Sequence, residues 1–114
     1  MLKQGGMRER VWSVFPRGGS HPAKLAWALK EHLERQGFGV ERVARTEWGF
    51  RLELRGAEIL LAEHAVEPGV LELRVRPRGR LFTPGTRARV DKLSGAVWGF
   101  LTEHPALRVE EVSA

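Results

Sequence analysis

Two segments in which apolar and charged residues alternate, Glu47–Arg55 and Val70–Arg76, constrain most strongly what this chain can fold into. Apolar residues take every second position of both: Phe50, Leu52, Leu54, Leu71, Leu73 and Val75. A period of two is that of a β-strand with one buried face. Between them, Ala57–His64 is apolar at consecutive positions, which predicts a central strand. The chain therefore has to build a sheet whose apolar face needs a covering layer.

Two segments with helical periodicity can supply that layer. The first begins at Ser20 and Pro22 and stops at Gly37, which are favoured start and stop residues. Its predicted core residues recur at helical spacing: Leu25, Ala26, Leu29 and Leu33. The second begins at Thr83 as N-cap, with Pro84 next, and ends before Pro105. Its predicted core face is Val90, Leu93, Val97 and Leu101.

Three further strands complete the prediction: Arg10–Phe15, Phe38–Thr46 and Leu107–Val112. The resulting order is β-α-β-β-β-β-α-β. We expect an α+β two-layer sandwich, with a mostly antiparallel sheet and two helices on one face. The two outer β-α-β units favour a ferredoxin-like plan with an extra strand or hairpin inside. We expect residues 1–6 to form a disordered leader and residues 7–114 a single α+β domain.

The stretch Glu47-Trp48-Gly49-Phe50 lies a short distance after the helix that ends in Gly37-Phe38. This arrangement resembles a group of small bacterial proteins with an Asp/Glu-Trp-Gly-Trp/Phe strand motif. The resemblance covers about thirty residues, Leu25 to Leu54. It implies a small α+β domain and implies no activity, cofactor or functional residue.

Positive charge is concentrated in one strand-loop-helix segment. Seven cations lie between residues 74 and 92, and subtracting Asp91 leaves +6 there, so the rest of the chain sums to −1 of the net +5. The seven are Arg74, Arg76, Arg78, Arg80, Arg87, Arg89 and Lys92. Clustered guanidinium groups bind phosphates well. We therefore predict that this segment binds a polyanion or nucleic acid. The alternative is a solvated arginine surface paired to the chain's glutamates.

Self-association is a further prediction. Trp27 falls on the polar side of the first helix. Gly95 and Gly99 lie on the side of the second helix opposite its core face, where they present no side chain. Two glycines within a helix cost roughly 1 kcal/mol each relative to alanine, which a close approach by another backbone would offset. These three residues are the predicted interface of a homodimer.

No residue pattern predicts catalysis or metal binding. The four histidines, His21, His32, His64 and His104, lack ligand spacing, and the chain has no cysteine. We predict no catalytic residue, metal or cofactor. The chain reads as a non-enzymatic binding or protein-interaction module; the alternative is a small enzyme or enzyme subunit with an unidentified site.

Composition indicates source and location. The chain has no Asn, only two Gln, and fifteen Arg against four Lys. Few thermolabile amides and many long charged side chains suit a thermophile, and high Arg also follows from a GC-rich genome. With no long apolar run and no secretory signal pattern, we expect a cytoplasmic protein that does not enter a membrane.

Overall fold

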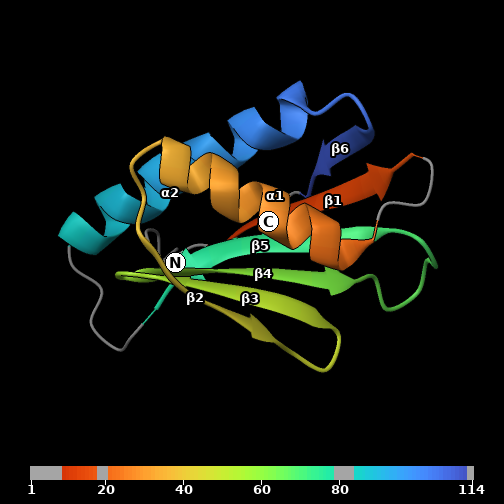
Figure 1. The fold of residues 1–114 in the computed structure, drawn as a ribbon, viewed down its shortest axis with the longest axis horizontal. Helices are drawn as coiled ribbons and strands as arrows, with labels where there is room; N and C mark the ends of the chain where they lie inside the picture. Colours follow the sequence, from red (N-terminus) through yellow and green to blue (C-terminus); the bar gives the residue numbers. More distant parts are fainter. Residues whose placement is uncertain (1–8, 18–20, 79–83, 113–114) are drawn as a thin grey trace, which may run out of the picture.

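The computed structural model describes residues 9–17, 21–78 and 84–112 (Figure 1). Its elements follow the expected order: β1 (Arg10–Pro16), α1 (Pro22–Arg35), β2 (Val40–Arg45), β3 (Gly49–Leu54), β4 (Ala57–Glu63), β5 (Leu71–Pro77), α2 (Pro84–Glu103) and β6 (Leu107–Glu111). The predicted 1–6 leader, Arg80 and the Thr83 cap lie outside the described residues.

The six strands form one sheet in the order β2-β3-β4-β5-β1-β6, and every neighbouring pair is antiparallel. Strands β2 to β5 form a meander, and β1 and β6 join it at the β5 edge. This is the ferredoxin-like plan of two β-α-β units, β1-α1-β2 and β5-α2-β6, with one additional hairpin, β3–β4, inserted between them. The prediction that residues 57–64 form an interior strand is confirmed, since β4 lies between β3 and β5.

Both helices cover the same face of the sheet (Figure 1). Helix α1 packs against β2, β3 and β4, whereas α2 packs against β4, β5 and β6. The predicted core faces are confirmed, because every predicted apolar position of both helices is buried. The buried strand residues beneath them include Trp12, Val14, Leu52, Ile59, Leu61, Leu73 and Val75. The fold is thus a two-layer α+β sandwich.

One expectation needs correction. Strand β3 begins at Gly49 rather than Glu47, because Glu47 and Trp48 form the turn that follows β2; the N–H of Thr46 donates to the carbonyl of Gly49 at 2.8 Å. The close approach of a second copy at Gly95 and Gly99 stays a prediction. A Cβ atom added at either position would meet no atom within 4 Å, so both glycines of α2 border open space.

Candidate functional site

The uncovered face of the sheet carries the strand arginines of the predicted binding segment. Arg74 and Arg76 alternate with the buried residues of β5, so they point away from the helices. Glu9 lies between them: its Oε1 is 2.6 Å from Nη1 of Arg74, and its Oε2 is 3.5 Å from Nη1 of Arg76. Arg74 also donates to Glu72 at 2.9 Å, and Arg76 donates to Glu58 at 2.6 Å. Both arginines therefore already have two carboxylate partners.

These contacts affect the pKa of both guanidinium groups. Partial burial opposes the charged form of Arg74, but hydrogen bonds and attraction from Glu72 and Glu9 outweigh it and raise its pKa. For Arg76, the hydrogen bond to Glu58 is the largest cause of a raised pKa, and partial burial opposes it. An anionic ligand would have to displace these carboxylates.

Arg78 is paired in the same way at the end of β5. Its Nη1 donates to Glu41 and to the carbonyl of Leu54, each at 3.1 Å. Its Nη2 lies 3.3 Å from Glu53, which also accepts from Arg51 at 3.0 Å. Two guanidinium groups thus cover Glu53, which is only 9% exposed although it faces away from the helices. The strand part of the segment matches the alternative reading, an arginine surface paired to glutamates.

The helical part of the segment is different. Arg87, Arg89 and Lys92 are exposed, and none has an ion-pair partner within the described ranges. At 100° per residue, Arg87 lies about 160° around α2 from Arg89, whereas Lys92 lies only about 60° from Arg89. The fold therefore brings Arg89 and Lys92 together and separates Arg87 from them. The strand arginines face away from the helix layer altogether, so the seven predicted cations do not form one surface.

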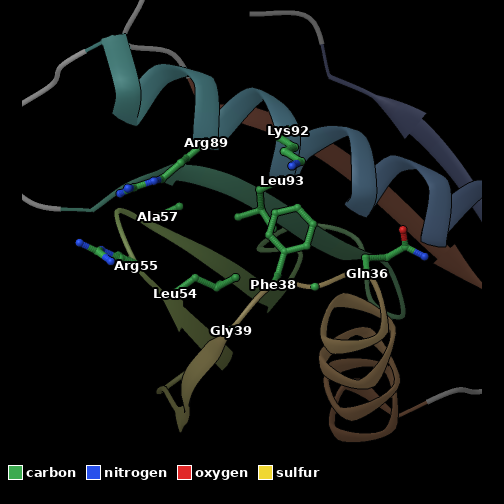
Figure 2. A pocket seen from close by; sticks show the side chains of 10 residues that line it. Gln36, Phe38, Gly39, Leu54, Arg55, Ala57, Arg89, Lys92 and Leu93 are labelled. Carbon is green, nitrogen blue, oxygen red and sulfur yellow. The ribbon is translucent and has the colours of Figure 1, made fainter.

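Arg89 and Lys92 border a cleft of about 250 Å³ between the end of α1, the β3–β4 turn and α2 (Figure 2). Three of its ten lining residues are cationic and none is acidic: Gln36, Gly37, Phe38, Gly39, Leu54, Arg55, Ala57, Arg89, Lys92 and Leu93. The third cation is Arg55, which is exposed and, like the other two, has no ion-pair partner in the part of the chain that is described.

Sequence reasoning missed Arg55 as a site residue. In sequence it is one more outward residue at the end of an alternating strand. Its closeness to Arg89 arises because α2 packs above the turn that follows β3. The guanidinium groups of Arg55 and Arg89 extend toward the same side of the cleft (Figure 2). No local pattern joins two residues that are 34 positions apart, so no sequence signal could have found this pair.

Two glycine-dependent turns shape the cleft. The first follows α1, where Gly37 has a φ of +91° and the N–H of Phe38 donates to the carbonyl of Leu33 at 2.9 Å. This hydrogen bond, with that from Gly37 N–H to Glu34 at 3.1 Å, is the Schellman arrangement that ends a helix. The second turn contains Gly56, with a φ of +76°, between β3 and β4. Left-handed values of φ favour glycine at both positions.

The histidines serve the fold in the described structure. Nδ1 of His64 accepts from the N–H groups of Val66 and Glu67, each at 3.2 Å, and so closes the loop after β4. His104 accepts from Ala106 in the same manner at 3.2 Å. The ring of His32 lies 5.3 Å from that of Phe100, where the two helices meet. None of these three histidines lines either of the two clefts described.

The fourth histidine lies at a second cleft. His21 lines a cavity of about 410 Å³ with Glu47, Glu63 and the exposed Trp48. Among the described residues, no hydrogen bond or ion pair joins His21 to either carboxylate. The same part of the chain holds no group of three or more His, Cys, Asp or Glu side chains placed to bind one metal ion.

The predicted interface residues lie on the helix layer, Trp27 on α1 and Gly95 and Gly99 on α2. Trp27 is 51% exposed, and Nζ of Lys30 lies 5.5 Å from the centre of its ring. It lies about 140° around α1 from His32, the residue that contacts α2. Gly95 lies on the exposed side of α2, and Gly99, half-buried, adjoins it one turn on.

No protein-family model matches this chain, and comparison with curated proteins finds no relative. The resemblance to small bacterial proteins with a Trp-Gly strand motif therefore stays a prediction. None of the helices in the described residues is long and apolar enough to cross a membrane.

Proposed function

We propose that this protein is a small cytoplasmic, non-enzymatic binding module, and that its ligand is a polyanion held at the cleft of Arg55, Arg89 and Lys92. One observation supports the proposal: three cations without carboxylate partners in the described structure line one cleft that has no acidic residue. The strand arginines offer a contrast, since Arg74, Arg76 and Arg78 are each bonded to glutamates.

The physical reason is electrostatic. Cations gathered at one cleft repel one another unless counter-ions or a ligand offset the repulsion. A polyanion releases its own condensed counter-ions when it meets such a cluster, and this release favours binding. Guanidinium groups also match the geometry of phosphate oxygens. Free guanidinium groups at a cleft therefore bind an anionic ligand without first breaking internal ion pairs.

Binding of inorganic polyphosphate, measured by calorimetry over a series of salt concentrations, tests the proposal. We expect binding to be weakened by each of three variants, Arg55→Ala, Arg89→Ala and Lys92→Ala. Each should also reduce the slope of log affinity against log salt concentration by about one, because each removes one phosphate contact. Lys24→Ala is the matched control, because Lys24 is exposed, lies outside the cleft and has no ion-pair partner among the described residues.

A second variant separates the cleft from the uncovered face of the sheet. Arg74→Ala should change polyphosphate affinity much less than Arg89→Ala, because its guanidinium group is held by Glu9 and Glu72. An equal loss for Arg74→Ala and Arg89→Ala would move the binding surface to the sheet. Wild-type protein that binds no polyphosphate at low salt would contradict the proposed function itself.

We also propose a homodimer, for which exposed tryptophans are the supporting observation. Trp27 is 51% and Trp48 is 67% exposed, and Trp48 lines the second cleft. Large exposed aromatic side chains are enriched at interfaces. Light scattering at high protein concentration should give twice the monomer mass for the wild-type chain. The Trp48→Ala variant should give a mass closer to that of the monomer. A monomer mass for the wild-type chain would contradict this proposal.

A further inference from the structure

The cleft has an apolar floor beneath its cationic rim. Leu54, Ala57 and Leu93 are buried, with exposed fractions of 4%, 2% and 1%. Phe38 is only half-buried, and its ring stands in the middle of the cleft between α2 and the β3–β4 side (Figure 2). A site for phosphate groups alone needs no such floor, because anionic oxygens gain nothing from an aromatic surface. Leu54, Ala57 and Leu93 belong to the protein core, so the half-buried Phe38 offers the apolar surface that a ligand can reach. Such a surface suits a ligand with a flat apolar part as well as charge.

The cations flank this floor on two sides. Arg55 and Arg89 extend together at one end of the cleft, and Lys92 reaches from α2 toward the ring of Phe38 (Figure 2). Arg89 lies close to the β3–β4 turn, since its Nη1 would be 3.3 Å from a Cβ on Gly56. Charge at two places with an aromatic surface between them matches a nucleotide within a strand. There, a base lies between the phosphates on its two sides.

We propose that the cleft takes one nucleotide unit of a single-stranded nucleic acid, with its base stacked on Phe38 and its neighbouring phosphates on Arg55, Arg89 and Lys92. The inference rests on the proposed function and adds the class of polyanion. A cleft of about 250 Å³ is large enough for a single base. In a duplex the bases are stacked on each other and their faces are not available, whereas an unpaired base presents its face to an aromatic side chain.

Wild-type protein provides the first test, which depends on no variant folding. A labelled strand of about ten thymidines is compared by fluorescence anisotropy with an abasic strand of the same length and charge. We expect the abasic strand to bind about 5- to 150-fold more weakly, the loss that removal of a stacked base produces. Equal affinity of the two strands would overturn the inference. A ribonucleotide strand of the same bases shows which sugar is preferred, and preference over an abasic strand with either sugar supports the inference.

The second test changes the floor. Phe38→Leu keeps an apolar side chain of similar volume but removes the aromatic ring. We expect weaker binding of the thymidine strand and unchanged binding of inorganic polyphosphate, which has no bases. Unchanged binding of both probes would overturn the stacking on Phe38.

The two proposals fail in different ways. If wild-type protein binds neither polyphosphate nor the thymidine strand, the proposed function fails, and the nucleotide inference fails with it. If it binds polyphosphate, the thymidine strand and the abasic strand with equal affinity, polyanion binding stands and only the nucleotide inference fails.

Discussion

The guanidinium group of Arg89 in α2 lies over Gly56 in the β3–β4 turn. A Cβ atom at Gly56 would be 3.3 Å from Nη1 and 3.7 Å from Cδ of Arg89. The absence of a side chain at Gly56 therefore leaves space that the arginine uses. Arg89 thus approaches the sheet layer at the wall of the cleft, which Arg55 also lines.

Gly56→Ala should displace Arg89 and weaken polyphosphate binding. An alanine at a φ of +76° costs about 1–2 kcal/mol in backbone strain, and its Cβ would press on the guanidinium group. Gly69→Ala is the control: its φ is +82° and a Cβ there meets nothing within 4 Å. We expect similar losses of stability in denaturant unfolding, but weaker binding only for Gly56→Ala. Equal binding by the two variants would contradict the role of this contact.

Two glycines should respond in opposite directions to alanine. A Cβ at Gly49 would overlap the carbonyl oxygen of Leu61 and lie 2.9 Å from Cα of Ala62, so β3 and β4 would have to separate. We expect Gly49→Ala to lower the free energy of unfolding by about 1–3 kcal/mol or more. Gly95→Ala should raise it by about 0.5–1 kcal/mol, because Gly95 lies within α2 and borders open space. Urea unfolding measures both, and a stable Gly49→Ala protein would argue against the tight approach of β3 and β4.

Arg76→Ala should lower the free energy of unfolding by about 1 kcal/mol, since it removes the partly exposed ion pairs with Glu58 and Glu9. The pKa of Arg76 is raised by its folded partners, so this contribution is fully present below the unfolded pKa and is lost only as pH rises through the folded value. The decrease in unfolding free energy caused by Arg76→Ala should therefore be the same at pH 7 and about pH 10. A loss that shrinks between these two pH values, measured by denaturant unfolding, would contradict the assignment to Arg76.

Thermal unfolding should have a midpoint well above the range of about 45–65 °C that is usual for mesophilic domains. The expectation comes from the absence of Asn and the high Arg and Glu content, and networks such as that around Glu9 supply a physical reason. Calorimetry measures the midpoint directly. A midpoint near 50 °C would count against a thermophilic source.

Local sequence patterns were sufficient to predict the helices and strands of the fold. Alternation at Phe50, Leu52 and Leu54 predicted β3 and the face it buries, because a strand's side chains have a period of two. Pro84 and Pro105 bracketed α2, because proline is tolerated in the first turn of a helix and excluded from its interior. These signals act within a few residues, so one sequence is enough to detect them.

The candidate site depended on contacts that no local pattern encodes. Arg74 and Arg89 look alike in the sequence, yet the fold places Arg74 between two glutamates and leaves Arg89 without a carboxylate partner in the described structure.

The Trp48-Gly49-Phe50 stretch separates what the sequence determines from what the tertiary structure determines. The sequence by itself determined that Phe50 begins an alternating strand, and it placed the excess charge between residues 74 and 92. Only the tertiary structure decided that Gly49 must lack a side chain against β4, that Trp48 is left exposed, and that Arg55 joins Arg89. The physical reason is that the spacing of apolar residues along a strand or helix is set by residues a few positions apart in the sequence. Ion pairing and clefts depend instead on which distant strands and helices pack together.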